Sequence, residues 1–501
     1  MPRFIPPRLV LPGAVVLALA IVFLVASVTR PGTAPATGTA GQAVAVTSVT
    51  RSCPPAPPGS ARTTIAVTAQ PPHAAAGNAA GSGTTGSGGA TGTAVFSAVQ
   101  QAPSGAAKSS GTGAAAKPVT VSAAGTAATV TTGGGAGTAV AAVGQMAMGF
   151  EAEQANASGT GLVSCSHAGS DLWFVGTGQA AGATQVWLYL MNTGTVTASA
   201  DVTILTDTGE QSGLSSAVTV QPGQFVKVNI APLVRGSQAV ALHVQATTGQ
   251  VSASAWEGNG SSGAWLPQAA APSTTQVIPG LTVASSAAKL FVVVPGATDA
   301  QLQLVAYTPA GGVRQFPGTP VEASAGAATP LALNSLGASA AGLKLTSNVP
   351  VVAGVLVPGS GIGSFTAAAA PVTQQGVVAG NPVSRGLSVG LLLTAPGTAT
   401  SVSVSLISAD GTVTKPAADQ GVTVAAGHTL ALAVPRPPGA RQPFAIVVTP
   451  AAGSGPLYAV RVVTAGPGGL SAPVVSLLPV PSALTTVTLP PASDSYQAVL
   501  P

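Results

Sequence analysis

The chain of 501 residues has few charged residues, since 17 Lys and Arg and 12 Asp and Glu make up only 6% of it, against about 25% in an average soluble domain. The formal net charge of +5 is therefore spread thinly, and the body of the chain contains no cluster of Lys and Arg. A surface that binds nucleic acid needs such a cluster to neutralise phosphates. We therefore expect no nucleic-acid partner.

Aromatic residues are also scarce, at 4%, and no segment after Val28 has the apolar period of an ordinary amphipathic helix. Gly (63 residues) and Pro (43 residues) are abundant instead, and Ala, Val, Thr and Ser supply most of the remainder. Val and Thr favour strands, whereas Gly and Pro end them. The composition predicts an all-β protein with cores of small side chains, and the length indicates roughly three or four domains.

Residues that could hold a metal ion or perform catalysis are few. The histidines are His73, His167, His243 and His428. None has a second His, Cys or carboxylate at metal-ligand spacing. His167 lies between Cys165 and Asp171, as in a Cys/His nucleophile, but a turn beside a disulfide is the favoured interpretation. We predict no catalytic residue, no metal site and no cofactor.

Glu151 and Glu153 form the closest pair of carboxylates. Residues two apart on a strand share one face, and a glycosidase places two carboxyls at a fixed separation across a cleft. A solvated strand edge is the favoured interpretation of this pair. An envelope hydrolase that uses Glu151 and Glu153, or His167, is the alternative.

Cysteine is limited to Cys53 and Cys165, so only one intramolecular pairing exists. An oxidising compartment favours a disulfide between them, and two buried free thiols are the alternative. The disulfide would close a loop of about 110 residues and contribute up to ~4–5 kcal/mol in the chain-entropy model. The low-complexity stretches 73–92 and 104–117 lie within this loop and cannot build a core.

The longest apolar run extends from Leu9 to Val28 without a charged residue. About 20 apolar residues span a bilayer, whereas the core of a cleavable signal has about 7–15. Arg3 and Arg8 precede the run, so the positive-inside rule places the N-terminus in the cytoplasm and the remainder outside. We predict a single-pass plasma-membrane protein whose C-terminal body lies outside the cytoplasm. Secretion after signal cleavage is the alternative.

Three segments share an order of strand and turn signals at a period of about 100 residues. Each begins with a β-rich run that ends at a glycine turn, at 186–194, 290–296 and 389–397. Glycines at three successive turns keep step between the segments: Gly194, Gly296 and Gly397, then Gly209, Gly311 and Gly411, then Gly223, Gly326 and Gly427. Six or seven short strands in about 100 residues are typical of an immunoglobulin-like or fibronectin-like sandwich, whereas propeller blades repeat every ~40–50 residues.

The predicted fold class is therefore all-β, with an N-terminal transmembrane helix followed by tandem immunoglobulin-like or fibronectin-like β-sandwich modules. Segment 46–160 has strand signals but a weak register with the three repeats, so we predict a degenerate β module with low-complexity loops there. The full division is a cytoplasmic stub (1–8), a transmembrane anchor (9–29), a flexible tether (30–45), the degenerate module (46–160), β-sandwich modules 1 (161–275), 2 (276–380) and 3 (381–490), and a tail (491–501).

All four tryptophans fall in module 1, and they are Trp173, Trp187, Trp256 and Trp265. Trp stacks on sugar faces and is enriched at interfaces. Packing inside the core is the favoured interpretation, particularly for Trp187, which shares a strand face with Tyr189. The alternative is a binding surface in which Trp256 and Trp265 are the exposed members. These two, with Trp173, are the candidate ligand or interface residues.

The segment Cys165-Ser-His-Ala-Gly-Ser-Asp-Leu-Trp-Phe-Val-Gly176, followed by a strand that ends Leu-Met-Asn192, resembles an uncharacterised family of actinobacterial envelope proteins. Cys53-Pro54-Pro55 and Trp265-Leu266-Pro267 also match elements of that family. Its members look exported or single-pass, and they are often encoded beside a large membrane glycosyltransferase of the family-two type. The resemblance implies a role in envelope polysaccharide, with that glycosyltransferase or its polymer as the partner.

These observations predict a non-catalytic, membrane-anchored scaffold or interaction protein of the cell envelope that assists polysaccharide assembly. A glycan-binding or adhesion module, which would use the tryptophans of module 1, is the alternative. The envelope hydrolase is a weaker third hypothesis, because no catalytic constellation in the sequence is complete.

Overall fold

The computed structural model describes residues 42–489 apart from 70–91, 104–118, 123, 157–158, 180–182, 213–216, 261, 283–287, 312, 316–319, 334–340, 360 and 467–468. The chain divides into two compact units, Ala45–Thr486 and a second made of Met1–Val44 with Val487–Pro501. The described part of the second unit consists of most of β1 (Gln42–Ala45) and most of β37 (Thr486–Leu489). These two strands pair with one another. The predicted stub, transmembrane anchor and tail, and most of the tether, lie outside the described residues.

The unit Ala45–Thr486 is all-β, as the composition predicts. Its described residues form strands and short 3-10 turns, the latter at Gly144–Ala147, Ala231–Leu233, Ala417–Asp419 and Gly469–Ser471. Burial alternates along strands such as β22 (Ala300–Tyr307), where Leu302 and Leu304 are buried and Gln303 is exposed, which is the period of a half-buried strand. Within the described ranges, no helix has the length and apolarity that a membrane crossing requires.

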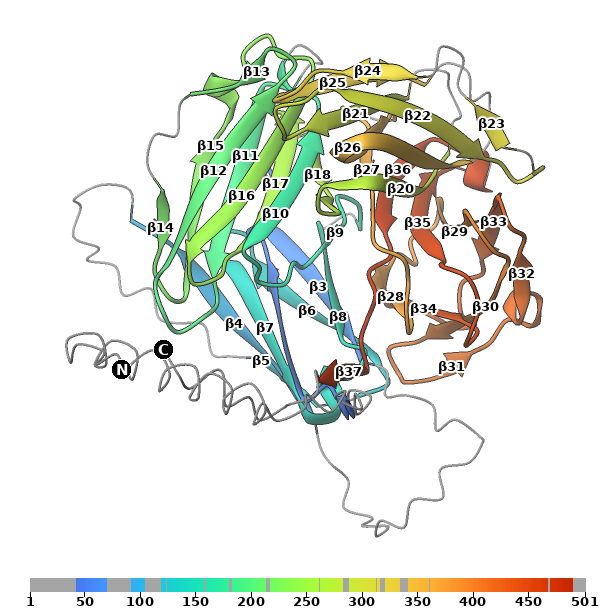
Figure 1. The fold of residues 1–501 in the computed structure, drawn as a ribbon. Coiled ribbons are helices and arrows are strands. Elements are labelled where there is room, and N and C mark those ends of the chain that lie inside the picture. The colour runs from blue at the N-terminus through green and yellow to red at the C-terminus, as the bar shows by residue number, and fades with distance from the viewer. Residues whose placement is uncertain are drawn as a thin grey trace, which may run out of the picture. The chain divides into compact units, whose positions relative to one another are not determined.

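The strands form four successive β-sandwiches that share one topology (Figure 1). The short additional strands of sandwiches 2, 3 and 4 (Gln268–Ala269, Val218–Val220, Val321–Ala323 and Val422–Val424) are left out of the following numbering. The other strand positions of each sandwich, numbered one to eight in chain order, form one sheet with the order 1-6-3-4 and a facing sheet with the order 5-2-7-8. Sandwich 1 has this order although its sequence is out of register with the other three. This arrangement confirms the all-β, sandwich-like fold class.

Sandwich 1 comprises β2 (Ser48–Cys53), β3 (Arg62–Thr68), β4 (Thr93–Gln101), β5 (Val119–Val121), β6 (Ala127–Gly133), β7 (Gly137–Val143), β8 (Glu151–Asn156) and β9 (Val163–Ser164). Sandwich 2 comprises β10 (Asp171–Gly176), β11 (Gln185–Asn192), β12 (Ala198–Thr206), β13 (Gly209–Glu210), β14 (Val218–Val220), β15 (Gln224–Asn229), β16 (Val240–Thr248), β17 (Ser252–Asn259), β18 (Ser262–Leu266) and β19 (Gln268–Ala269). Each sandwich encloses its own apolar cluster between its two sheets.

Sandwich 3 comprises β20 (Ser273–Leu281), β21 (Lys289–Val294), β22, β23 (Val313–Gln315), β24 (Val321–Ala323), β25 (Ala327–Ala332), β26 (Ala341–Val357) and β27 (Ser364–Ala367). Sandwich 4 comprises β28 (Gly376–Asn381), β29 (Leu387–Ala395), β30 (Thr400–Ile407), β31 (Val413–Thr414), β32 (Val422–Val424), β33 (His428–Val434), β34 (Phe444–Pro450), β35 (Tyr458–Ala465) and β36 (Val474–Pro479). The long strand β26 occupies positions six and seven, because it pairs with β20 and β22 in one sheet and with β21 and β27 in the other.

The repeated glycine turns have a conformational cause. Gly209, Gly311 and Gly411 follow position three in sandwiches 2, 3 and 4, and their φ angles are 101°, 78° and 84°. Only glycine adopts such angles without steric cost. A local backbone requirement therefore explains why these glycines keep step in the sequence.

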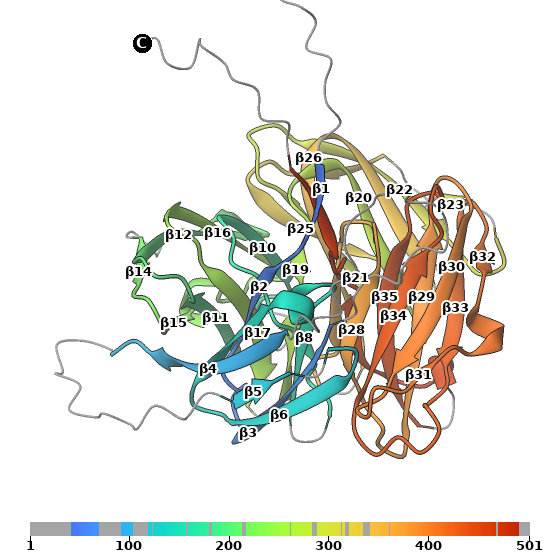
Figure 2. The same ribbon diagram turned by 90° about the horizontal axis from the view of Figure 1, so that it is seen from below.

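The four sandwiches form a closed cycle of contacts within the unit Ala45–Thr486. Sandwiches 1 and 2 share a continuous sheet through the parallel pairing of β4 with β15. Sandwiches 2 and 3 bury one apolar cluster that includes Trp173 and Phe291, and the core of sandwich 3 continues into Leu392 and Val460 of sandwich 4. Sandwich 4 packs in turn on sandwich 1, where β28 lies beside β8 (Figure 2).

Candidate functional site

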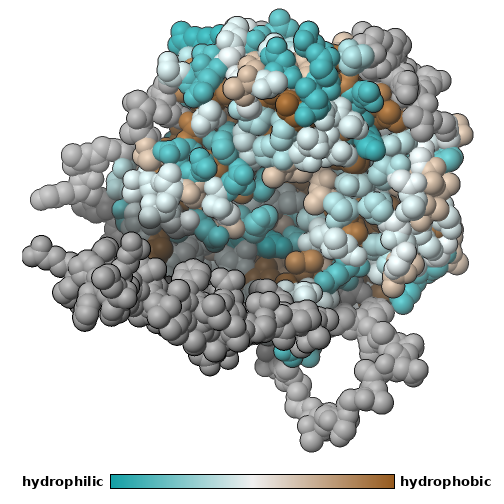
Figure 3. Space-filling model, in the orientation of Figure 1, coloured by the Kyte–Doolittle hydropathy of each residue, from teal (hydrophilic) through white to brown (hydrophobic). Residues whose placement is uncertain are grey.

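A cavity of about 340 Å³ is lined by residues from all four sandwiches. In the orientation of Figure 1, the surface is hollowed between them (Figure 3). Small-molecule sites are commonly clefts of about 300–1,000 Å³ that lie between domains. The cavity is therefore the candidate functional site of the described part of the chain.

The walls of the cavity are mostly apolar. Its apolar residues include Leu162, Val163, Trp265, Pro267, Phe365, Leu477, Leu478, Pro479, Val480 and Pro481. Leu162 and Val163 come from the start of β9 in sandwich 1. The others come from β18, β27 and β36 and from the segments that follow β18 and β36, and these three strands pack side by side. Each sandwich thus contributes a strand end or a connecting segment, so the cavity requires the whole cycle.

An ion pair, Arg51 with Glu151, forms the charged part of the cavity wall. Arg51 on β2 donates two hydrogen bonds to Glu151 on β8, from Nη2 to Oε1 at 2.7 Å and from Nε to Oε2 at 3.2 Å. The side chains are 17% and 5% exposed. Because this bidentate geometry neutralises both charges locally, the wall carries an ion pair but no net charge.

His167 lies beside this ion pair on the cavity wall. Partial burial lowers the pKa of His167, and the nearby charge of Arg51 lowers it further, while Glu151 opposes the change. Although the residue is exposed at the surface, a pKa below the ordinary value of about 6.5 leaves the imidazole mostly neutral at pH 7. The hydroxyls of Ser254, Ser364 and Ser476, all on buried residues, supply further uncharged polar groups to the wall.

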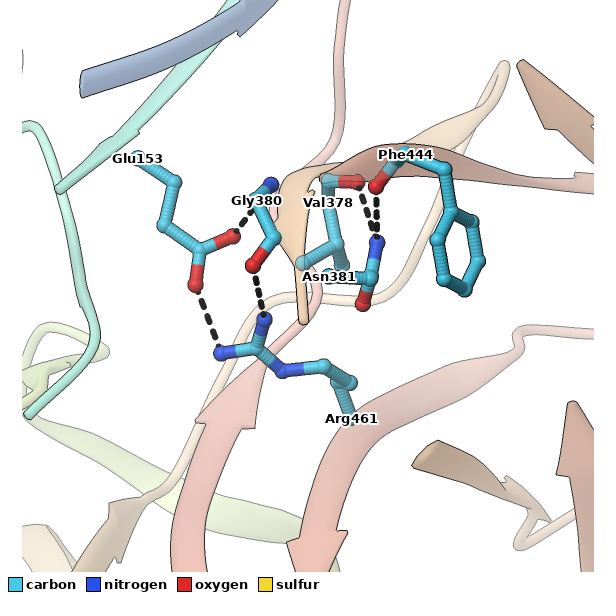
Figure 4. Close-up of polar contacts among 6 residues, drawn as sticks. All are labelled: Glu153, Val378, Gly380, Asn381, Phe444 and Arg461. Carbon is cyan, nitrogen blue, oxygen red and sulfur yellow. Dashed lines mark hydrogen bonds and ion pairs between the residues drawn. The ribbon is translucent and has the colours of Figure 1, made fainter. Parts of the chain in front are cut away.

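Glu153, two residues along β8, is held in a second ion pair (Figure 4), and neither partner lines the cavity. Its Oε1 lies 2.6 Å from Nη2 of Arg461 on β35, although the two atoms lack the alignment of a hydrogen bond. The backbone N–H of Gly380 donates to Oε2 at 2.9 Å, and Arg461 Nη1 donates to the carbonyl of Gly380 at 3.5 Å. Both side chains are buried, at 3% and 0% exposed. The pKa of Glu153 is raised by burial, while Arg461 and the Gly380 N–H oppose the rise.

The prediction of a solvated strand edge is wrong for both carboxylates, because Glu151 and Glu153 are buried. The physical reason is that β8 lies between two other parts of the chain. β2 supplies one arginine and sandwich 4 supplies the other, and sequence spacing reveals neither contact.

Cys53 and Cys165 form the predicted disulfide, with a Cα–Cα distance of 4.3 Å and a sequence separation of 112. It ties the end of β2 to the segment after β9, where Ser52 and Ser166 form an isolated bridge. Cys165 lines the cavity but is not a thiol, so it cannot be the nucleophile of a Cys/His pair.

Three tryptophans that the sequence marks as candidate ligand or interface residues are buried, since Trp173, Trp256 and Trp265 are 4%, 2% and 5% exposed. Their burial agrees with the favoured interpretation of packing in a core, and the alternative, in which Trp256 and Trp265 are exposed, is wrong. Both do point away from the core of sandwich 2, but the apolar cluster that includes Val99 and Val163 of sandwich 1 covers that face. Of the three, only Trp265 lines the cavity.

The remaining tryptophan also differs from its expectation. Trp187 pairs with Trp256 across strands β11 and β17 but is only half-buried, and Lys227 Nζ lies 3.7 Å from the centroid of its ring. Trp173, in contrast, stacks on His243 with ring centroids 3.9 Å apart, and Nε2 of His243 lies 2.9 Å from Asp171.

Of the other predicted features, His73 lies outside the described residues. His428 begins β33, and its Nδ1 lies 2.9 Å from the carbonyl of Ala426. In the described ranges, no group of three or more His, Cys, Asp or Glu residues could hold a metal ion.

Sequence reasoning missed Arg51, Arg461 and Glu257. Arg461 is the one charged residue of an otherwise largely apolar strand, YAVRVVTA. Its position in this strand is the signal from which a buried ion pair could have been predicted. Glu257 on β17 is fully buried, and its Oε2 accepts hydrogen bonds from Thr177 N at 3.1 Å and Thr177 Oγ1 at 2.7 Å. Its Oε1 has no hydrogen-bond partner among the described residues. Burial raises the pKa of Glu257 to about 7.

Comparison with protein families identifies a match over much of the chain. Residues 119–435 match the model of a family described as "Family of unknown function (DUF5719)". This region includes both glutamates of β8, Cys165 and all four tryptophans, but neither Arg51 nor Arg461. No curated protein matches the chain.

Proposed function

The chain belongs to the family of unknown function DUF5719, and from its structure we propose a non-catalytic scaffold that is anchored in the plasma membrane and acts outside the cytoplasm. Its work is to hold partners of the cell envelope in a fixed arrangement. The actinobacterial origin and the part in polysaccharide assembly, which the sequence resemblance implies, belong to the same proposal.

The observation that carries this proposal is the closure of the cycle by sandwich 4 on sandwich 1. The contact combines an apolar cluster with the buried pair Glu153–Arg461. Backbone hydrogen bonds add to it, from Ala127 N to Ser408 O at 3.1 Å and from Gly149 N to Leu484 O at 3.0 Å. A closed array holds its outer surfaces at fixed positions relative to one another, and a scaffold requires this. Modules that are joined only by flexible linkers lack such fixed positions.

Two features support a place outside the cytoplasm. A disulfide persists in oxidising compartments and is rare in the cytosol, and Cys53 and Cys165 are paired. The apolar run from Leu9 to Val28, preceded by Arg3 and Arg8, suits a single membrane span. Secretion after cleavage of this segment is the alternative.

The glycan-binding alternative has weaker support. Two of its candidate residues, Trp173 and Trp256, are enclosed between sandwiches, and the half-buried Trp187 already has Lys227 over its ring. The hydrolase alternative is weaker still, because Glu151 and Glu153 are each paired with an arginine and Cys165 is a disulfide partner.

The test is a pull-down of the full-length tagged chain from crosslinked membranes of the native organism. We expect recovery of a membrane glycosyltransferase or its polymer. The variant Arg461→Ala, which disrupts the closure of the cycle, should lose this partner, whereas Arg441→Ala, at an exposed position, should keep it. Recovery of neither partner, or a protein found only in the medium, would contradict the proposal.

A further inference from the structure

The cavity has a chemistry of its own, which a scaffold role does not explain. Protein interiors are close-packed, with few voids larger than a water molecule, yet about 340 Å³ remains open where four sandwiches meet. Large side chains such as Trp265 and Phe365 stand in its wall, so small residues alone do not explain the space. A space of this size has room for a small organic molecule.

The charges of the wall select against an ionic occupant. Arg51 and Glu151 neutralise one another through two hydrogen bonds, and both are largely withdrawn from water. A charged ligand would either break this pair or enter without a counter-ion, and each route leaves a poorly solvated charge. His167, the third ionisable residue of the wall, is mostly neutral at pH 7.

The remaining wall selects the body and the polar group of the ligand. The apolar segments around Trp265, Phe365 and Leu477 favour a hydrocarbon or aromatic body. The hydroxyls of Ser254, Ser364 and Ser476 can each donate or accept a hydrogen bond, which suits a hydroxyl or carbonyl group.

We propose that the cavity lined by the four sandwiches is a binding site for a small uncharged molecule with an apolar body and a hydroxyl or carbonyl group. The site exists only while sandwich 4 is packed on sandwich 1, since the segment after β36 forms one wall and β2 with β8 forms another. Ligand binding and closure of the cycle are therefore coupled.

Benzophenone is a suitable probe, because it is uncharged, has two apolar rings and a carbonyl, and forms covalent bonds to nearby C–H groups under light. The full-length chain is labelled in membranes, and the labelled peptides are mapped by mass spectrometry. We expect saturable labelling of the peptides that contain Trp265, Phe365 and Leu477. Labelling spread evenly over the body, or confined to the peptides around 9–28, would overturn the proposal.

A cavity-filling variant provides the matched test. Ala370 is an exposed wall residue, so Ala370→Trp should fill the cavity without disturbing a core and should reduce the labelling about tenfold. Ala264→Phe, from sandwich 2, is a second filling variant. Ala452→Trp, in an exposed turn outside the cavity, is the control and should label as the unchanged chain does. Equal labelling in folded filling variants, as judged by an unchanged melting temperature, would place the probe elsewhere.

The neutrality of the ligand can be tested separately. 4-Benzoylbenzoate has the same rings and carbonyl with an added carboxylate, and it should label the cavity about tenfold less than benzophenone, because its charge must be desolvated. Equal labelling by the two probes would overturn the ligand class. Neither probe reports on the envelope partner, so these results and the pull-down fail independently.

Discussion

Sandwich 1 makes two contacts with other sandwiches, and they are built from different side chains. The contact with sandwich 2 is largely aromatic, and it contains Val99, Val163, Tyr189, Met191, Phe225, Trp256 and Trp265. The contact with sandwich 4 uses smaller side chains, which are Ala127, Val377, Ile407, Ala445, Val447 and Ala483. Among the described residues, a fully buried ion pair, Glu153–Arg461, is found in the second contact and not in the first.

The difference follows the distance that separates the partners along the chain. Sandwiches 1 and 2 are consecutive and share a sheet, so they meet at a low cost in chain entropy, and non-directional burial of large rings is enough to hold them. Sandwiches 1 and 4 are separated by the other two sandwiches, and small apolar residues specify position weakly. A buried ion pair contributes little net stability when complete but strongly disfavours any arrangement that separates its charges. We infer that this pair fixes how the cycle closes.

The largest expected effect comes from breaking the closing contact. Arg461→Ala leaves the carboxylate of Glu153 buried without its counter-charge, which should lower the free energy of unfolding by about 3–5 kcal/mol. The measurement is chemical denaturation of the full-length chain. Arg441→Ala, an exposed arginine of the same sandwich, should leave the midpoint unchanged.

A double variant separates the charge from the packing. Glu153→Leu combined with Arg461→Met removes both charges and keeps apolar volume, so it should recover most of the lost stability. Instability of the double variant equal to that of Arg461→Ala would mean that the pair itself supplies the stability and does not merely fix how the cycle closes.

The aromatic contact should respond to loss of volume rather than to loss of charge. Trp256→Ala removes a side chain that is 2% exposed and should cost about 3–5 kcal/mol. Trp187→Ala, its neighbour across the strands, should cost only about 1–2 kcal/mol because it removes a half-buried ring and one cation–π contact. Equal costs, measured by thermal unfolding, would show that sandwich 1 does not cover Trp256 in solution.

The disulfide lies within sandwich 1, and its removal tests whether the contacts of this sandwich depend on a covalent bond. Removal of the Cys53–Cys165 bond by a double alanine substitution should cost about 2–5 kcal/mol. The reductant-treated wild-type chain should unfold at the same midpoint as the double variant, and reductant should leave the variant unchanged. A wild-type chain that is insensitive to reductant would indicate that packing alone holds the β2 end against the segment after β9.

Local requirements explain what the sequence could predict. Positive φ at turns such as Gly209 and Gly411 demands glycine whatever the tertiary context, so the repeat was visible, and with it the strands. Two cysteines allow one pairing, so the disulfide followed from their number. Strand alternation also placed Trp187 and Tyr189 on one face of β11 correctly.

Contacts between sandwiches were beyond such reasoning. Alternation places Trp256 on the outer face of its sheet, but it cannot tell whether another sandwich covers that face. The partners of Glu151 and Glu153 lie on β2 and β35, and no local pattern connects them to β8. The cavity belongs to the same class of feature, because its wall is assembled from all four sandwiches.

A pH-dependent effect distinguishes Glu153 from Glu257, a buried carboxylate that has no arginine partner among the described residues. Burial raises the pKa of Glu257 from its ordinary value to about 7. A carboxyl with a raised pKa keeps its proton longer in the folded state than in the unfolded state. Its contribution to stability is therefore fully present below its unfolded pKa of about 4.3 and is lost as the pH rises through about 7. This loss should amount to about 3–4 kcal/mol.

Glu257→Gln removes the titration and retains an oxygen that accepts from Thr177, so the variant should lose that part of the pH dependence and be more stable than wild type at pH 8. The measurement is the unfolding free energy between pH 4 and pH 8, with Glu322→Gln, an exposed carboxylate on β24, as the control that keeps the wild-type slope. If the slope of Glu257→Gln equals that of wild type, Glu257 is solvated or ion-paired in solution. If the slope changes only in Glu257→Gln, a carboxylate buried in this fold needs a positively charged partner to be ionised. The Glu153–Arg461 pair, in which an arginine is that partner, implies the same.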